Sequence, residues 1–324
     1  MSEDDEELTY ADAGVDIEAS EAATGALVGA VSDLDDETAY AGLLDIGDRF
    51  LGLATDGVGT KLLVADAIED YSTIGIDCIA MNVNDLVASG VRPVAFVDYL
   101  AVDDPSEDLA EGIGEGLAVG AEEADVALVG GETAVLPEVV SGFDLAGTAA
   151  GLAPKGAIFP GEAEVGDALV GFRSSGIHSN GLTLAREAVT RDHDYTDPFP
   201  GADRSIAAEL LEPTRIYTYL LDDLRQHDVH AAAHVTGGGW TNLERMGEYR
   251  YEITDPFDAQ RVFEFVQAEG NVSDEEMHRT FNMGTGFVVA LPKDEAESLV
   301  EATDGRVIGE VEAGERVAIR GLEL

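Results

Sequence analysis

The most constraining part of this chain is the stretch at residues 55–61, which reads T-D-G-V-G-T-K. The preceding residues 50–54 are apolar and predict a short buried strand, so the chain leaves a sheet and enters a turn. Gly57 and Gly59 allow positive φ and a close approach of backbone N–H groups to oxyanions. The stretch therefore predicts an anion-binding turn that follows a strand.

Two charged side chains of this turn refine the prediction. Asp56 can hold a hard cation through its oxygens, and Lys61 can neutralise the charge of a phosphate. This combination suits a polyphosphate and a divalent ion, although the G-x-x-x-x-G-K-[ST] spacing of a P-loop is absent. Taken alone, the stretch is equally consistent with a solvated turn that binds nothing.

A second candidate carboxylate is Asp85, in a segment at 73–90 that predicts a mostly apolar helix. Asn82 and Asp85 share one stripe of this helix. A buried amide and carboxylate with satisfied hydrogen bonds would also explain them. Because Asp56 offers a second carboxylate, we favour a functional role for Asp85 as a ligand of a divalent ion.

The third candidate, Glu132, lies in G-G-E-T at residues 130–133, directly after a strand predicted at 126–129. A carboxylate behind two glycines at the end of a strand sits where ligands approach α/β folds. Asp56, Asp85 and Glu132 together predict a site for a nucleotide with divalent ions. No Ser/His/Asp order, zinc spacing or Rossmann fingerprint supports a different chemistry.

Two more glycine-rich turns are candidates for anion binding. Residues 174–181 read S-S-G-I-H-S-N-G and open a helix, where free N–H groups combine with the side chains of His178 and Asn180. Residues 234–240 read H-V-T-G-G-G-W and end a strand predicted at 229–235. The chain therefore carries three turns that could hold phosphate groups.

The alternation of helices and strands predicts an α/β or α+β protein with two layers, and 324 residues suffice for two domains. A Gly-, Pro- and acid-rich stretch at 156–166 divides the chain into domains at 1–158 and 159–324. Residues 35–46 are expected to form a loop. Further helices are expected at 18–32, 105–123, 214–227, 259–268, 273–280 and 293–302, and further strands at 93–102, 145–153, 167–172, 286–291, 306–311 and 316–321.

The charge of the chain limits the classes of binding partner that it can have. Its 18 Lys and Arg and 66 Asp and Glu give a formal net charge of −48. A chain this acidic repels nucleic acids and anionic membranes. Its acids are spread over the whole length, as on a halophilic surface. The single Cys78 excludes an internal disulfide, and no apolar run is long enough for a membrane span. We expect a cytoplasmic protein.

The motifs A-G-V-D-I, T-D-G-V-G-T-K, G-I-D-x-x-A-M-N-V-N-D-L, G-G-E-T-A, S-S-G-x-H-S-N-G, P-T-R-I-Y, H-x-T-G-G-G and R-T-F-N-M-G-x-G follow in this order from about Tyr10 to Leu291. Together they resemble the phosphoribosylformylglycinamidine cyclo-ligase (aminoimidazole ribonucleotide synthetase) family of purine biosynthesis. With the acidity, the resemblance implies a haloarchaeal member. It also implies a homodimer whose N-terminal sheets pair into a barrel, with active sites between the two halves of each chain.

The resemblance implies a reaction as well. ATP would phosphorylate the formamide oxygen of formylglycinamidine ribonucleotide, an internal nitrogen would close the imidazole ring, and ADP and phosphate would leave. Phosphorylation converts an amide oxygen, a very poor leaving group, into a good one. The implied cofactors are ATP and Mg²⁺, with a role for K⁺ left open.

The same resemblance assigns residues. Asp56, Asp85 and Glu132 would be metal and ATP ligands, supported by Asn82 and Asp77, and His178, Lys61 and Asp85 would be catalytic. His178 could act as an acid or base or only position its neighbours, and His234 is expected to be structural. The remaining nucleotide, phosphate or substrate contacts would be Gly57, Gly59, Thr60, Lys61, Ser175, Ser179, Asn180, Thr236, Gly237, Gly238, Gly239 and Asn282.

Other readings remain open at this point. Formylglycinamidine synthetase, thiamine-phosphate kinase, selenophosphate synthetase and a hydrogenase-maturation protein share the implied fold, and thiamine-phosphate kinase is the strongest rival enzyme. From another class, the chain could be a silent scaffold that keeps the dimer and the nucleotide site. Retention of the three carboxylates speaks against a silent scaffold.

Overall fold

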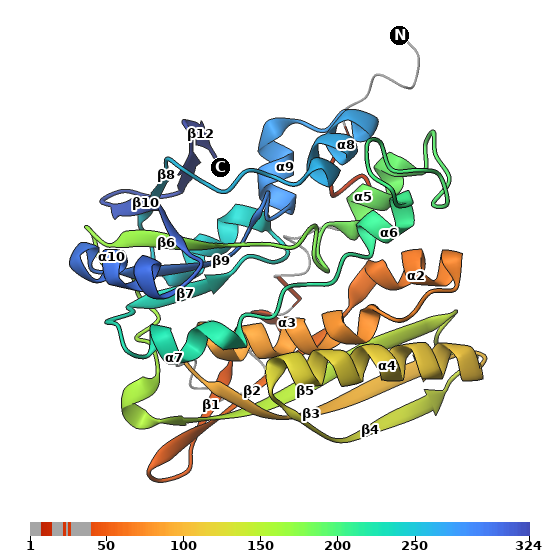
Figure 1. The fold of residues 1–324 in the computed structure, drawn as a ribbon, viewed down its shortest axis with the longest axis horizontal. Helices are drawn as coiled ribbons and strands as arrows, with labels where there is room; N and C mark the ends of the chain where they lie inside the picture. Colours follow the sequence, from red (N-terminus) through yellow and green to blue (C-terminus); the bar gives the residue numbers. More distant parts are fainter. Residues whose placement is uncertain (1–7, 15–21, 24, 27–39) are drawn as a thin grey trace.

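The computed structural model describes residues 8–14, 22–23, 25–26 and 40–324, which form two sheets with packed helices (Figure 1). The first sheet has five strands in the order β1-β2-β5-β3-β4, and the second has seven in the order β12-β11-β8-β10-β6-β9-β7. This arrangement confirms the predicted two-layer α/β architecture. The helix predicted at 18–32 lies mostly outside the described residues.

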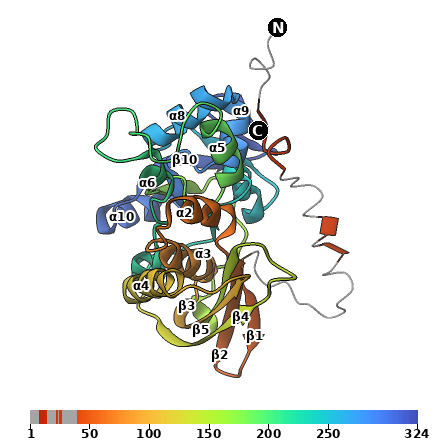
Figure 2. The ribbon, with the colours of Figure 1, turned by 90° about the vertical axis from the view of Figure 1, so that its right-hand side faces the viewer.

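The first sheet is mixed, since β3 and β4 run parallel and its other neighbouring strands run antiparallel. Two helices, α3 (Ile74–Ala88) and α4 (Glu107–Ala124), cover one of its faces (Figure 2). They approach each other backbone to backbone, because a Cβ added to Gly75 would lie 2.2 Å from Leu117 N. The strands are β1 (Gly42–Asp45), β2 (Arg49–Gly57), β3 (Arg92–Val102), β4 (Ala127–Val135) and β5 (Phe143–Pro154).

The second sheet contains β9 (Thr285–Leu291), which is buried along its whole length. Its flanking strands are β6 (Ala168–Arg173) and β7 (Ala231–His234), both antiparallel to it. The outer strands are β8 (Arg250–Ile253), β10 (Arg306–Glu312), β11 (Val317–Ile319) and β12 (Leu322–Glu323), and the helices are α5 (Leu182–Val189), α6 (Ile206–Leu210), α7 (Leu221–Leu224), α8 (Arg261–Gly270), α9 (Asp274–Thr280) and α10 (Lys293–Ala302).

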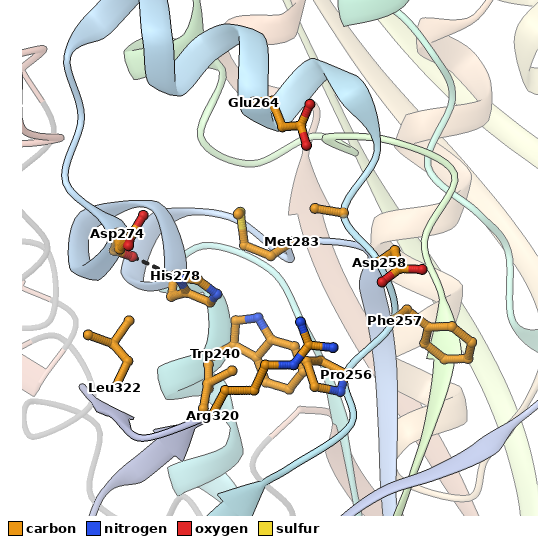
Figure 3. A pocket seen from close by; sticks show the side chains of 12 residues that line it. Trp240, Pro256, Phe257, Asp258, Glu264, Asp274, His278, Met283, Arg320 and Leu322 are labelled. Carbon is orange, nitrogen blue, oxygen red and sulfur yellow. Dashed lines mark hydrogen bonds between the residues drawn. The ribbon is translucent and has the colours of Figure 1, made fainter.

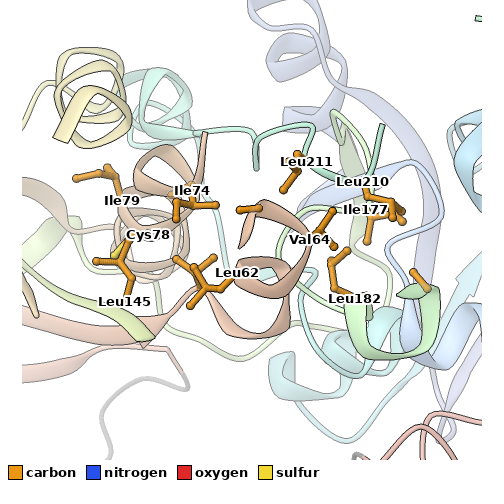
Figure 4. Packing of buried hydrophobic residues seen from close by; sticks show 14 of the residues in the cluster. Leu62, Val64, Ile74, Cys78, Ile79, Leu145, Ile177, Leu182, Leu210 and Leu211 are labelled. Carbon is orange, nitrogen blue, oxygen red and sulfur yellow. The ribbon is translucent and has the colours of Figure 1, made fainter. Parts of the chain in front are cut away.

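Helix α2 (Leu62–Ile68) connects the two halves through one continuous apolar core (Figure 4). Its Leu62 and Val64 belong to the same cluster as Cys78 of α3 and Leu182 of α5. Cys78 is a free thiol buried in this core. Strand β5 ends at Pro154 and β6 begins at Ala168, so the predicted division at 158/159 falls in a connecting segment. Because the two halves share this core, the division of the chain into two independent domains remains a prediction.

Three predictions about elements were wrong. The end of the loop predicted at 35–46 forms β1, which pairs with β2 in a hairpin. The strand predicted at 126–129 does not end before the G-G-E-T segment, because β4 continues through it and stays paired with β3 as far as Val135. The helix predicted at 214–227 is reduced to two short helices at Thr218–Leu220 and Leu221–Leu224.

The shortened helix has a physical cause in the side chains of α3. Thr214 N donates to Asp77 Oδ1 at 2.7 Å, and Tyr217 N donates to Asn84 Oδ1 at 2.8 Å. These bonds fix residues 214–217 against α3 in a non-helical conformation. The sequence analysis did not predict α2, α6 or β8.

Candidate active site

The three predicted turns meet in space. Thr60 Oγ1 lies 2.9 Å from Thr183 Oγ1, next to the 174–181 turn, and a Cβ added to Gly59 would lie 4.0 Å from Ser179 O. The third turn joins them, since a Cβ added to Gly237 would lie 3.3 Å from Asn180 Oδ1. The structure therefore brings the candidate anion-binding turns from both halves of the chain together.

Two of the three predicted carboxylates also converge here. Asp56 lies at the end of β2, and Asp85 lies on α3, which packs on that strand. Partial desolvation and, next in size, the charge of Asp85 raise the pKa of Asp56. Asn82 bridges the same two elements, because its Nδ2 donates to Asp56 O at 3.2 Å and to Cys78 O at 2.8 Å.

This carboxylate pair fits a divalent ion. Two carboxylates that repel each other gain stability from a cation between them. Mg²⁺ usually takes only one or two protein carboxylates together with substrate phosphates and water. The buried Asn82 Oδ1 beside them has no hydrogen-bond partner among the described residues. Within those residues, no three His, Cys, Asp or Glu side chains form a metal-binding group.

Asp85 is held from the second sheet. Its Oδ1 lies 3.0 Å from Nδ1 of His234, the last residue of β7. The His234 side chain is completely buried, whereas that of Asp85 is 21% exposed. The histidine therefore fixes one carboxylate oxygen while solvent still reaches the carboxylate.

Lys61 is not placed where a phosphate could reach it. Its Nζ donates to Asp77 Oδ1 at 2.9 Å and to Glu212 O at 2.7 Å, and its side chain is fully buried. Burial lowers the pKa of Lys61, while the charge of Asp77 opposes this effect. Lys61 thus ties α3 to the segment before residue 214, a role that its place in the glycine-rich turn did not reveal.

Glu132 is also separated from the other two carboxylates within this chain. Asp56 on β2 and the G-G-E-T segment on β4 are connected by a row of paired residues that crosses β5 at Gly147 and β3 at Asp98 and reaches Gly131. Three strand spacings therefore separate Asp56 from this segment. At about 4.8 Å per spacing, the separation is roughly 14 Å. Glu132 is also paired with Tyr99 on β3. Side chains alternate between the two faces of a strand, and the buried Phe96 and Leu100 of β3 face the helices. Tyr99 and Glu132 therefore lie on the opposite face of the sheet.

The glycines of the turns have unequal roles. Gly59 has a φ of +72°, as an anion-binding turn requires, whereas Gly57 lies in β2 and is not among the positive-φ glycines. In the third turn, Gly238 and Gly239 have φ values of +95° and +54°. A Cβ on Gly239 would lie 2.3 Å from His278 O, so Gly239 also permits close packing on α9. Thr236 N donates to Asn242 Oδ1 at 2.7 Å, which closes this turn on itself.

His178 is a buried hydrogen-bonding residue with a φ of +67°. Its Nε2 accepts from Ser175 N at 3.1 Å and lies 3.4 Å from Arg215 N. A nitrogen that accepts two N–H groups carries no proton, so the proton is on Nδ1, which has no partner among the described residues. Burial lowers the pKa of His178 well below its usual range.

The other predicted contacts in the 174–181 turn are engaged within the protein. Ser175 Oγ donates to Pro213 O, and Ser179 Oγ lies 3.2 Å from Thr214 Oγ1. Asn180 Nδ2 lies 3.9 Å from Met81 Sδ, over α3. Asn282 Nδ2 donates to Gly176 O at 2.9 Å, so Asn282 supports this turn from below.

Arg245 is a cation that the sequence analysis missed. It lies in the 3-10 helix η5 (Gly239–Met246), which follows the third turn, and its Cζ lies 5.1 Å from the ring centroid of Tyr40. Burial raises the pKa of both Asp56 and Tyr40, and the positive charge of Arg245 opposes this rise in both. Arg245 is exposed and has no ion pair among the described residues. Its position six residues after the T-G-G-G segment was the available signal.

A separate cavity of about 610 Å³ lies in the second half of the chain, beside α8 and α9 (Figure 3). Trp240, Phe257 and Met283 supply apolar walls, and His278 and Arg320 supply polar groups. Trp240 directly follows the T-G-G-G segment, so the cavity adjoins the third turn. None of the three candidate carboxylates lines it.

Comparison with known families identifies the class of protein. A model described as AIR synthase related protein, N-terminal domain, matches residues 38–153, and the corresponding C-terminal domain model matches residues 164–321. The chain therefore belongs to the AIR synthase related proteins.

Its curated relatives narrow the class. The phosphoribosylformylglycinamidine cyclo-ligase of Methanococcoides burtonii is 49% identical, with 98% of both chains covered. The enzyme of the same name from Pyrococcus horikoshii is 45% identical, with 91% of each covered. The chain is thus a member of the phosphoribosylformylglycinamidine cyclo-ligase family.

Solved structures show the same fold at low sequence identity. A thiamine monophosphate kinase from Aquifex aeolicus has a TM-score of 0.67 and 17% identity, covering 96% of this chain and 99% of that one. A HypE–HypF complex matches with a TM-score of 0.69 and 20% identity, covering 93% and 97%. These likenesses support the fold alone. Among the described residues, no helix has the length and apolar character needed to span a bilayer.

Proposed function

We propose that this chain is an ATP-dependent ligase that converts formylglycinamidine ribonucleotide into aminoimidazole ribonucleotide in purine biosynthesis. The formamide oxygen takes the terminal phosphoryl group of ATP, an internal nitrogen attacks the activated carbon and closes the ring, and ADP and phosphate leave. Membership in the cyclo-ligase family and the convergence of the three turns support this reaction.

One observation carries the chemistry, namely the Asp56–Asp85 pair at the meeting point of the turns. These two carboxylates would hold Mg²⁺, which when bound neutralises charge on the phosphates of ATP. The carboxylate pair alone would repel a triphosphate, so the fit requires a cation. A role for K⁺ belongs to the same proposal and can be tested by exchanging K⁺ for Na⁺.

The remaining residues of the site either contact the phosphates or hold other groups in place. Since Lys61 is buried, we assign the direct contact with phosphate oxygens to Arg245 rather than to Lys61. Gly59, Thr60 and the third turn would supply backbone N–H and hydroxyl donors. His178 is buried like Lys61, so we assign it the role of positioning the 174–181 turn, where its Nε2 accepts from Ser175 N.

The proposal includes a homodimer formed through the first sheet. The sheet face opposite α3 and α4 exposes several large apolar side chains: Leu44 (58%), Leu53 (45%), Val97 (39%) and Tyr99 (46%). A contiguous apolar face of this kind marks an interaction surface. A second copy would cover it with the same residues, and Glu132, on that face, would then lie at the interface.

The acidic surface supports a further part of the proposal, that the protein works in the cytoplasm of a halophilic archaeon. The net charge of −48 produces strong self-repulsion at low ionic strength. Molar salt screens this repulsion to within a few ångströms. We therefore expect the folded dimer to require high KCl.

The function is tested by ADP release from the purified protein in molar KCl with Mg²⁺ and ATP. Release should depend on formylglycinamidine ribonucleotide and should fall at least about 100-fold in Asp85→Asn. His234 can still donate to the new amide oxygen, so this variant should unfold near the wild-type temperature. If a folded dimer released ADP at the same rate with and without formylglycinamidine ribonucleotide, the proposal would be refuted.

A further inference from the structure

Asp85 is the end of a chain of hydrogen bonds that begins at the 174–181 turn and crosses from one half of the protein to the other. Arg215 N lies 3.4 Å from His178 Nε2, and Arg215 O accepts from Asn84 Nδ2 at 2.9 Å. Asn84 Nδ2 also lies 3.3 Å from His234 Nε2, whose Nδ1 lies 3.0 Å from Asp85 Oδ1. Asn84 and His234 are both completely buried.

The orientation of the Asn84 amide follows from its neighbours. Its oxygen accepts from Tyr217 N at 2.8 Å, which requires an acceptor at that end of the side chain. Its nitrogen therefore faces both Arg215 O and His234 Nε2. An amide nitrogen can only donate, so His234 Nε2 accepts and carries no proton.

The tautomer of His234 then decides how Asp85 is held. In a neutral imidazole with an unprotonated Nε2, the proton is on Nδ1, which donates to Asp85 Oδ1. A histidine protonated on Nε2 would instead set two donors against each other at Asn84 and two acceptors against each other at Asp85. The surrounding bonds therefore select one tautomer and one orientation of the carboxylate.

We propose that His234 is a positioning residue that fixes the Asp85 carboxylate for binding of Mg²⁺ and ATP, with Asn84 fixing the tautomer of His234. The inference rests on the proposed role of Asp85 in that site. It gives His234, which the sequence analysis expected to be structural, a specific role in the site. Partners that orient metal-binding carboxylates in this way typically change metal affinity or activity by about 10–100-fold when removed.

A first test needs no activity. Long-range ¹H–¹⁵N correlation spectra of the full-length protein in molar KCl report which ring nitrogen of each histidine is protonated, and a His234→Asn sample assigns the His234 signals. We expect the Nδ1–H form for His234. Detection of the Nε2–H form in the wild-type protein would overturn the proposal, even if the cyclo-ligase activity is as proposed.

A second test compares two amide substitutions. The amide of His234→Asn can place a donor near the former Nδ1, whereas the longer amide of His234→Gln places its nitrogen near the former Nε2, out of reach of Asp85. We expect His234→Asn to stay within about 3-fold of wild-type kcat/KM for MgATP and His234→Gln to lose about 10–100-fold. Mn²⁺ binding in the presence of a non-hydrolysable ATP analogue, followed by electron paramagnetic resonance, should weaken in the same order.

These outcomes separate positioning from stability. If His234 were only part of the core, both variants would lose thermal stability to a similar extent and Mn²⁺ binding would not distinguish them. Equal losses in Mn²⁺ binding for the two variants, or no loss in either, would contradict the proposal. Failure of the proposed reaction would instead show as no substrate-dependent ADP release from the wild-type protein.

Discussion

Lys61 and Asp77 form an ion pair that solvent does not reach, with Nζ 2.8 Å from Oδ2 and both side chains 0% exposed. Asp77 also accepts from Thr214 N and Thr214 Oγ1, so this one carboxylate connects α3 with residues from both halves of the chain. The pair replaces the open phosphate contact that the T-D-G-V-G-T-K stretch suggested.

Lys61→Met should therefore act on stability. The substitution leaves the Asp77 charge buried without its cation, which typically costs about 3–5 kcal/mol of unfolding free energy. Lys155→Met is the matched control, because Lys155 forms an exposed ion pair with Asp45, and such pairs contribute about 0–1 kcal/mol. Denaturant unfolding in molar KCl measures both. Unchanged stability in Lys61→Met, together with a raised KM for ATP, would show that Lys61 binds phosphate after all.

Arg245→Ala should weaken nucleotide use while leaving the fold intact. Hydrogen bonds to charged groups contribute about 1.5–3 kcal/mol, so we expect kcat/KM for MgATP to fall by about 10–150-fold. Lys293→Ala on α10, an exposed cation paired with Glu310, should leave it unchanged. Steady-state kinetics at fixed Mg²⁺ provide the comparison. A wild-type value in Arg245→Ala would remove Arg245 from the site.

The uncovered face of the first sheet predicts a dimer that one charge can disrupt. Val97→Glu would place a carboxylate in the centre of the interface and, by two-fold symmetry, another opposite it. Sedimentation in molar KCl should show twice the chain mass for the wild-type protein and a shift towards the monomer for Val97→Glu. Val119→Glu, at an exposed position on α4, should remain dimeric. A monomeric wild-type protein would exclude this interface.

Burial of neutral His178 predicts a pH dependence of stability. Because its folded pKa lies below the ordinary value of about 6.5, the unfolded chain binds this proton more readily. Unfolding free energy should thus be lost as pH falls below about 6.5, with this residue contributing up to about 1.4 kcal/mol per pH unit. His178→Asn, which tolerates the left-handed backbone, should have a shallower slope between pH 5 and 6.5. Equal slopes in the two proteins would show that His178 is not buried in its neutral form.

The sequence predicted most strands and helices, because their apolar periodicity and glycine boundaries are local signals. The helix predicted at 214–227 is shortened because Asp77 and Asn84, more than 130 positions away, hold its first residues against α3. The strand at 126–129 was predicted to end before G-G-E-T because two glycines interrupt an apolar run. In the structure, Gly131 faces the Asp98 carboxylate of the adjacent strand, where an added Cβ would lie 2.4 Å from Asp98 Oδ1.

The arrangement of the candidate site residues in space was predicted in part, for a related reason. Motif spacing identified the turns and the Asp56–Asp85 pair, since these residues belong to compact local patterns. It did not reveal that Lys61 is buried, because its partner Asp77 and the carbonyl of Glu212 come from other elements. It did not reveal Arg245 either, because its neighbour Tyr40 lies more than 200 positions away.

The most direct test of the central claim is the stoichiometry between ADP and aminoimidazole ribonucleotide, measured by chromatography on one reaction in molar KCl with Mg²⁺. Formylglycinamidine ribonucleotide should yield one aminoimidazole ribonucleotide for each ADP, and thiamine phosphate should yield no ADP above background. ADP formed with thiamine phosphate, or ADP formed from the ribonucleotide without ring closure, would contradict the assignment as a cyclo-ligase.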